Sequence, residues 1–416
     1  ADIDYNVLRW VASPYPAYGG LGPSHSHPET GELFAADIML EATQFRSAIR
    51  KANIWSDTKT SFEQSLNEMS NEMPIDQTEH ETCQVNHHLQ SNIAYALPLI
   101  SDEAEKKELI KQAIQYLVLH EVGHTLGLTH NMKASSSVSL ADLNQKSKQE
   151  RGLIPSVMDY PAVNTLAFNG QGYFLPTRPG AYDIWAIQYG YMPEMSDPEI
   201  AVNHLARSHE KLLAYDNDAA DMRGLGKGMD PRINIDDLSD DPVAFAKYQV
   251  AMDIDLLNKL KTKYLTETEK SSGVYLAYMK LLSNIGKQIG IMTKQIGGVY
   301  IERSVAGQAD IKPYEPVSKM DQMLAIDAIL DTVALIDSIK LPAEVIQNLT
   351  VEKRGFAATG VPLIAMHMSY GSSFPLVHVF APTTLNRLVE SQQYGNELTT
   401  HEVIDRFVEE IFLGDQ

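Results

Sequence analysis

The sequence has a single cysteine, Cys83, so no disulfide can form within the chain. This count fits a cytosolic protein and a periplasmic one equally well, and we expect the thiol to be a small, buried, apolar residue. No run approaches the roughly 18 apolar residues that a membrane span needs, so no span is predicted. Basic residues are scarce as well. The 34 Lys and Arg against 54 Asp and Glu give a net charge of −20, which argues against nucleic acid as a partner.

A leader segment is also missing, because the chain opens Ala-Asp-Ile-Asp and shows no basic stretch followed by an apolar one. We therefore expect a mature form or an excised fragment. The 416 residues, 44% of them hydrophobic and 21% charged, are enough for two domains with a substantial core. No internal repeat is present.

One stretch carries metal chemistry: His-Glu-Val-Gly-His-Thr-Leu-Gly-Leu-Thr-His, beginning at His120. His120 and His124 are four residues apart, so on a helix they lie one turn apart on the same face. Glu121 points to the same side and can hold a metal-bound water. Gly127 is placed to end the helix in a left-handed conformation, so the chain can turn and return His130 as a third ligand. Three nitrogens and one open position are the layout of a catalytic zinc site.

The residues before this motif predict the helix that carries it. Ser101 is a good cap residue, and Asp102, Glu103 and Glu105 follow where the helix dipole favours negative charge. Apolar residues between positions 109 and 118 recur at helical spacing. The histidines continue this inward face, and a metal gives them a reason to lie there.

A second motif, Ser156-Val157-Met158-Asp159-Tyr160, follows downstream. Zinc peptidases with the long histidine motif place a methionine turn beneath the metal. With both motifs, the chain resembles the metzincin clan of zinc endopeptidases. Residues 5–11 and 28–32 are similar to the bacterial family called Met-zincin. The resemblance covers most of the chain and is strongest up to about residue 195.

The resemblance implies an α+β fold in two parts. Residues 1–195 are expected to form a metzincin-like zincin catalytic domain, with a twisted sheet and an active-site helix. Residues 196–416 are expected to form a mostly α-helical C-terminal domain. Helical patterns mark 43–55 and 60–72 in the first part and 182–191 at its end. Those of the second part are 197–214, 242–266, 273–297, 317–338, 375–392 and 399–412. An acidic stretch over 216–241 is interpreted as a solvated loop.

The resemblance also implies roles at the site. Zn²⁺ is held by His120, His124 and His130, and peptide bonds are hydrolysed through a zinc-activated water with Glu121 as general base. Tyr160 either binds zinc and supports the oxyanion or packs beneath the site, and Met158 forms an apolar base. Asp159 either orients a ligand histidine or is a surface turn carboxylate.

The substrate is expected to be a peptide or protein. Residues 31–40 read as a strand, and in metzincins the strand in this position is the sheet edge that lines the cleft. An edge strand can pair with an extended peptide. By resemblance, the substrate backbone lies along residues 33–40, first of all against Leu33, Phe34, Ala35 and Ala36. The resemblance further implies export, to the periplasm or outside the cell.

Three alternatives stay open. Glu150, rather than His130, is the third ligand; or the chain is a non-catalytic zinc-binding protein of zincin fold; or it is a metal-dependent amidase acting on a non-protein substrate. The two histidines at positions 25 and 27, between prolines, read as a solvated turn, and His80, His87 and His88 as polar positions on exposed helix. The sequence does not determine the oligomeric state or the side chains preferred at the cleavage site.

Overall fold

The computed structural model describes residues 5–13, 20–53, 83, 85–100, 102–145, 152–168, 172–221, 224, 226–266, 272–303, 312–339, 343, 346 and 376–410. The chain divides into two compact units. Unit 1 comprises residues 1–217 and 235–240, and unit 2 comprises residues 218–234 and 241–416. The predicted domain boundary after residue 195 stays a prediction.

The sheet of unit 1 is built around β4 (Leu33–Glu41). On one side, β1 (Val7–Val11) pairs with it in parallel. On the other side, β2 (Gly20–Leu21) and β3 (Ser24–Ser26) pair with it in antiparallel fashion. The expectation that this strand is a sheet edge is therefore wrong. Part of the loop predicted over residues 13–28 is extended and forms β2 and β3. These strands pair with the backbone groups of β4 that a substrate was expected to bind.

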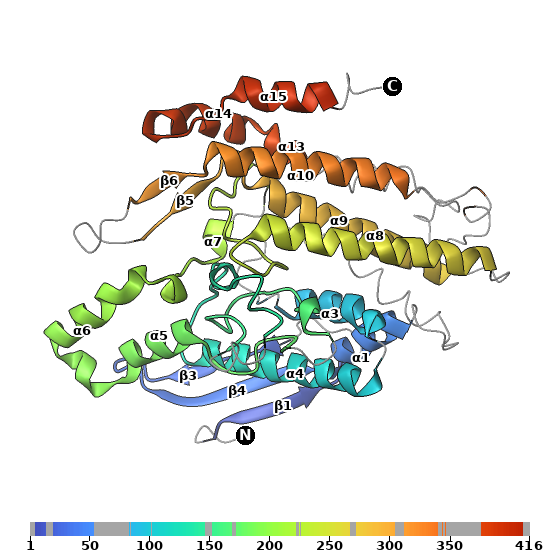
Figure 1. Ribbon diagram of the computed structural model, residues 1–416. Coiled ribbons are helices and arrows are strands. Elements are labelled where there is room, and N and C mark those ends of the chain that lie inside the picture. Colours follow the sequence, from blue (N-terminus) through green and yellow to red (C-terminus); the bar gives the residue numbers. More distant parts are fainter. Residues whose placement is uncertain are drawn as a thin grey trace, which may run out of the picture. The chain divides into compact units, whose positions relative to one another are not determined.

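The long helix of unit 1, α4 (Glu103–Thr125), lies across the sheet and contacts β4 and β2 (Figure 1). It is capped by Asp102, whose carboxylate accepts from the N–H groups of Ala104 and Glu105 at 2.8 and 2.9 Å. Half of the predicted apolar stripe is buried, with Leu109, Ala113 and Leu117 at 0% exposure, and the other half, Ile110, Ile114 and Val118, is half-buried. The buried residues N-terminal to the histidines therefore determine which face of α4 points to the interior.

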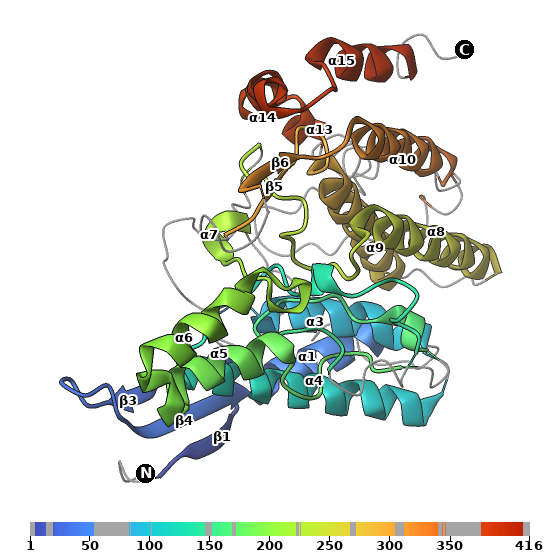
Figure 2. The ribbon, with the colours of Figure 1, turned by 60° about the vertical axis from the view of Figure 1, so that its left-hand side comes forward.

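Further helices of unit 1 pack around α4. α3 (Val85–Ala96) contacts both α4 and α1 (Ala42–Asn53), and Figure 2 shows α5 (Ala181–Tyr191) beside α6 (Pro198–Leu205). The predicted helices over 43–55 and 182–191 correspond to α1 and α5, whereas 60–72 lies outside the described residues. Short 3₁₀ turns complete the unit: η1 (Leu97–Leu99), η2 (Ser135–Ser137), η4 (Thr165–Ala167), η5 (Pro193–Ser196), η6 (Ala206–His209) and η7 (Lys211–Leu213).

Unit 2 is mainly helical. α8 (Pro242–Thr266) and α9 (Ser272–Thr293) lie side by side, and α10 (Lys319–Ser338) runs along them (Figures 1 and 2). The shorter elements are α7 (Asp218–Asp221), α13 (Leu376–Val379), α14 (Pro382–Ser391), η8 (Gln392–Tyr394) and α15 (Thr400–Val408). A hairpin of β5 (Val299–Ile301) and β6 (Tyr314–Pro316), absent from the prediction, interrupts the helices.

Two expectations for this region need correction. The helix predicted over 375–392 is divided, because Pro382 lacks the N–H that a continuous helix would need and begins α14 instead. The acidic stretch is not simply a solvated loop, since Asp216, Asp230, Asp236 and Asp237 are all buried. In unit 2, Asp230 is paired with Arg232 at 2.7 Å. Within the described part of the chain, no helix is both long and apolar enough for a membrane crossing.

Candidate metal centre

The end of α4 returns the chain toward its own last turn. Gly127 has φ +90°, the left-handed conformation predicted for it. Its N–H donates to the carbonyl of His124 at 3.0 Å, and the N–H of Leu128 donates to the carbonyl of Gly123 at 3.0 Å. These two bonds form a Schellman motif, which reverses the chain direction. His130 is thereby brought back beside the helix that carries the other two histidines.

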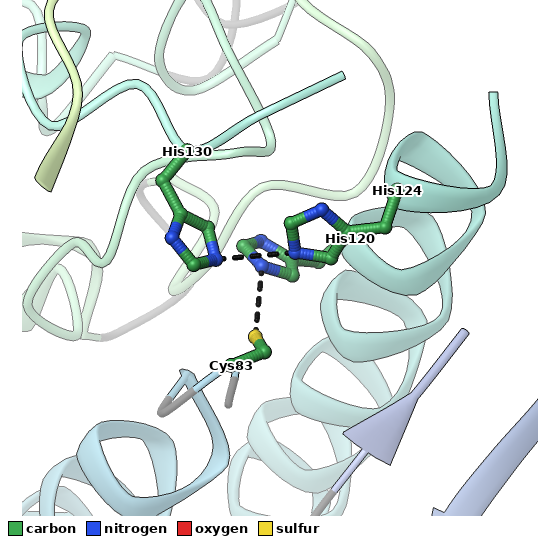
Figure 3. A group of neighbouring side chains, drawn as sticks. All are labelled: Cys83, His120, His124 and His130. Atoms are coloured by element: carbon green, nitrogen blue, oxygen red, sulfur yellow. Dashed lines mark hydrogen bonds between the residues drawn. The ribbon is translucent and has the colours of Figure 1, made fainter. Parts of the chain in front are cut away.

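Four side chains meet at this point, as Figure 3 shows. The Nε2 atoms of His124 and His130 are 3.1 Å apart, and the Sγ of Cys83 lies 3.3 Å from Nε2 of His120. All four potential ligand atoms lie within 4.8 Å of one another. The structure thus brings together the three predicted histidines and adds a thiol that the sequence analysis assigned to a buried apolar role. Cys83 is only half-buried.

The imidazoles are oriented by backbone carbonyls. Nδ1 of His120 lies 2.7 Å from the carbonyl oxygen of Val157, and Nδ1 of His124 lies 3.0 Å from that of Leu128. A carbonyl only accepts, so each Nδ1 carries the hydrogen and each Nε2 presents its lone pair to the cluster. Burial, together with the neighbouring His124 and His130, holds the pKa of His120 well below its usual value.

This donor set fits zinc. A tetrahedral ion with Zn–N bonds of about 2.0–2.1 Å requires its nitrogen ligands to be about 3.3 Å apart. The observed separation of 3.1 Å between the Nε2 atoms of His124 and His130 is close to that value. The four donor atoms also lie within 4.8 Å of one another, as ligands of a single ion must. His120, His124, His130 and Cys83 are the residues that would hold the ion.

The segment around Met158 is anchored from two sides. The carboxylate of Asp183, in the first turn of α5, accepts from the hydroxyl of Ser156 at 2.6 Å and from the N–H of Val157 at 2.9 Å. The N–H of Asn131 donates to the carbonyl of Met158 at 3.0 Å. Met158 is fully buried, and a Cβ atom added to Gly123 would lie 2.3 Å from its sulfur. The thioether therefore packs on α4 at Gly123, the residue before His124.

Asp159 has neither of its predicted roles. It is fully buried, and its carboxylate accepts from the backbone N–H groups of Ser135 at 2.6 Å and Tyr160 at 2.7 Å. Burial raises its pKa well above the usual value, and the nearby Asp237 raises it further. Asp159 therefore fixes the backbone that leads into Tyr160.

Tyr160 reaches the cluster itself. Its hydroxyl lies 3.0 Å from Nε2 of His130 and 3.5 Å from Sγ of Cys83. The ring of His88 lies against it, with centroids 5.3 Å apart, and Nδ1 of His88 lies 3.3 Å from the carboxylate of Asp236. His88 was expected on an exposed helix face. Its partner is 148 residues away in the sequence, so no local pattern revealed the contact.

Glu121 is buried, with 1% of its surface exposed, and directly follows His120 in the sequence. Among the described residues, neither of its carboxylate oxygens has a hydrogen-bond partner. Burial raises its pKa to about 7. The backbone of β2 lies directly against it, because a Cβ atom on Gly20 would be 2.2 Å from Oε1. An unpaired buried carboxyl is costly, so its presence at this position calls for a functional reason.

The predicted substrate-binding residues lie on β4 and pair with β3 through Leu33, Ala35 and Ala36. Leu33 and Phe34 are exposed, whereas Ala35 is buried. His25 is exposed and His27 is half-buried, and Nδ1 of His27 accepts from two N–H groups of the following turn. Glu150, the alternative third ligand, and His80 lie outside the described residues.

A family model described as Met-zincin matches residues 102–416. The chain belongs to the Met-zincin family. The match contains the three clustered histidines, Glu121 and Met158, whereas Cys83 precedes it. Membership of the Met-zincin family indicates a zinc metallopeptidase, which is a hydrolase. No curated protein and no solved structure matches the chain.

Proposed function

We propose that the protein is a zinc-dependent endopeptidase in which His120, His124 and His130 hold the metal. The observation that carries the proposal is the approach of the Nε2 atoms of His124 and His130 to 3.1 Å, with the Nδ1 atoms of His120 and His124 tied to backbone carbonyls. Such an arrangement directs nitrogen lone pairs to one point, where a cation can bind them. When bound, Zn²⁺ supplies Lewis-acid chemistry: it polarises a carbonyl and makes a water molecule acidic near neutral pH.

Glu121 is the proposed general base. Its pKa of about 7, raised by burial, allows it to accept and release a proton near neutral pH. We infer that it takes a proton from the attacking water and passes it to the leaving amine. Its burial beside β2 restricts the carboxylate to few positions, which favours a proton transfer of defined geometry.

Tyr160 is proposed to support the oxyanion. Its hydroxyl lies at the edge of the histidine cluster, 3.0 Å from His130, and can turn its O–H toward a developing negative charge. Met158 is proposed as the apolar base of a methionine turn, because its sulfur packs against α4 at Gly123. Both roles concern groups whose positions are set by the segment anchored at Asp183.

The substrate is proposed to be a peptide or protein, met outside the cytoplasm. We propose that the substrate contacts the exposed side chains of Leu33 and Phe34. We do not propose that the substrate pairs with β4 as with an edge strand, because β3 already pairs with β4 there.

The test is Glu121→Gln, which keeps the size of the side chain but removes its basicity. We expect kcat/KM for a peptide substrate to fall by about 10²- to 10⁴-fold. Zinc content should stay at the wild-type value because the ligands are untouched. The matched control is Glu103→Gln in the first turn of α4, whose side chain is exposed, and it should leave both quantities unchanged. Full peptide cleavage by Glu121→Gln would contradict the proposal.

A second candidate is favoured by one observation, the thiol of Cys83 within the cluster. Four protein ligands are typical of structural zinc sites, which have no open position. On this view the protein is a non-catalytic zinc-binding protein of the same fold. It predicts that neither the wild type nor any variant of the cluster cleaves peptides or other amides.

A further inference from the structure

The sulfur of Cys83 lies at a distance from the histidine nitrogens that suits a shared metal ion. Its sulfur lies 3.3 Å from Nε2 of His120, and the four donor atoms lie within 4.8 Å of one another (Figure 3). With bonds of about 2.3 Å to sulfur and about 2.0–2.1 Å to nitrogen, a tetrahedral zinc ion places these two atoms about 3.6 Å apart. The imidazoles of His120 and His124 present unprotonated nitrogens to the same point. The thiol therefore lies where a fourth ligand would be.

We propose that Cys83 is a fourth protein ligand of the metal and that it closes the position needed for catalysis. The inference rests on the proposed zinc peptidase. On ligation the thiol gives its proton to solvent and the sulfur donates an electron pair, so no oxidant or reductant is involved. A zinc ion held by all four side chains would have no open position, so Cys83 would have to release it as a thiolate, and take up a proton from solvent, before hydrolysis.

Two further observations support this assignment. The hydroxyl of Tyr160 lies 3.5 Å from the sulfur and 3.0 Å from His130, so it can donate to the sulfur while the site is closed. Once the sulfur leaves, the same hydroxyl is placed to face the oxyanion. Cys83 is also half-buried rather than enclosed, so a molecule that competes for its position has access to it.

The first test reads the ligand directly by X-ray absorption at the zinc edge of the full chain. The wild type should show one sulfur at about 2.3 Å besides nitrogen at about 2.0–2.1 Å, and Cys83→Ser should lose the sulfur while still binding zinc. The Co²⁺-substituted proteins should differ in the same way, with a sulfur-to-cobalt charge-transfer band only in the wild type. A wild-type spectrum with nitrogen and oxygen neighbours alone would overturn the proposal.

The second test uses the fact that the chain has one cysteine, so that alkylation by iodoacetamide reports on Cys83 alone. Zinc should abolish labelling over the time in which the metal-free protein is fully labelled. Mg²⁺, which prefers oxygen ligands, should give no protection. His124→Ala should lose the protection by zinc. Equal labelling with and without zinc would count against ligation by Cys83.

Cleavage assays separate this inference from the proposed function. If Cys83 closes the site, Cys83→Ser cleaves peptides several-fold faster than the wild type. A sulfur ligand with cleavage unchanged in Cys83→Ser would refute the closing role. A sulfur ligand with no cleavage by either protein would uphold Cys83 as ligand and refute the peptidase instead.

Discussion

At the scale of single residues, the close approach of Gly20 to Glu121 ties the backbone of β2 to the position of the proposed general base. A Cβ atom at position 20 would lie 2.2 Å from Oε1 of Glu121. The atom it meets is the tip of a side chain, which can move more easily than backbone. We therefore expect Gly20→Ala to leave the fold intact and to displace the carboxylate.

The predicted result for Gly20→Ala is a loss of about 10²-fold or more in kcat/KM, as for other losses of a positioned general base. Zinc content and the unfolding midpoint should change little. Gly190→Ala in α5 is the matched control, because no atom lies within 4 Å of its added Cβ. Wild-type activity in Gly20→Ala would show that the position of the carboxylate does not matter.

Residue spacing predicted that the three histidines meet, because two lie one turn apart on α4 and the third follows the chain reversal at Gly127. Cys83 could not be predicted in this way. Its contact with His120 joins residues 37 positions apart, and a single cysteine carries no spacing pattern. The same limit applies to the pair of His88 and Asp236.

At the scale of elements, α5 is the support of the segment that lies beneath the histidines. Asp183 connects its first turn to Ser156 and Val157, and it also accepts from the N–H of Gly180 at 2.9 Å. The carbonyl of Val157 in turn fixes the imidazole of His120. A change in α5 should therefore be felt at the metal.

We predict that Asp183→Asn destabilises the protein by about 1.5–3 kcal/mol, because charged hydrogen bonds to buried partners are lost or weakened. Zinc affinity should fall by about 10- to 100-fold, the usual effect of disturbing the groups that orient metal ligands. Urea unfolding and competition with a chelator measure the two effects. Asp197→Asn, at the exposed cap of α6, is the control and should leave zinc affinity unchanged. Unchanged zinc affinity in Asp183→Asn would mean that α5 does not support the site.

The helices were predicted closely where apolar periodicity and proline define them, as in α8 and α10. The strands β2 and β3 were missed. Their Gly-Leu and Ser-His-Ser segments are too short and too polar to show alternation, and their pairing with β4 is decided by tertiary contact. The edge position expected for β4 from the resemblance to metzincins was wrong because these two segments pair with it.

At the scale of the whole molecule, the second unit carries its own pH-sensitive group. His378 in α13 is buried, and its Nδ1 accepts from the N–H of Gly226 at 3.0 Å. Burial, together with the nearby Arg387 and Lys294, lowers its pKa to about 4. The folded state therefore holds this histidine neutral at pH values where the unfolded chain, with a pKa of about 6.5, is protonated.

Above about pH 6.5 the imidazole is neutral in both states and does not reduce the free energy of unfolding. As the pH falls from 6.5 toward 4, the unfolded chain takes up a proton that the folded state does not, and the free energy of unfolding decreases. At pH 5 the loss is about 2 kcal/mol. His378→Gln keeps an acceptor for Gly226 but does not titrate. We predict that the stability difference between wild type and His378→Gln shifts by about that amount between pH 7 and pH 5, in favour of the variant. Urea unfolding at the two pH values measures it, and a constant difference would contradict the burial of a neutral imidazole.

The carbonyl groups of Val157 and Leu128 have one further consequence. Both belong to the main chain, so no side-chain replacement at positions 157 or 128 deletes the oxygen that selects the imidazole tautomer. Alanine scanning would therefore not detect the contribution of these two hydrogen bonds. It would be exposed only by amide-to-ester exchange of the polypeptide or by proton-detected NMR of the two rings.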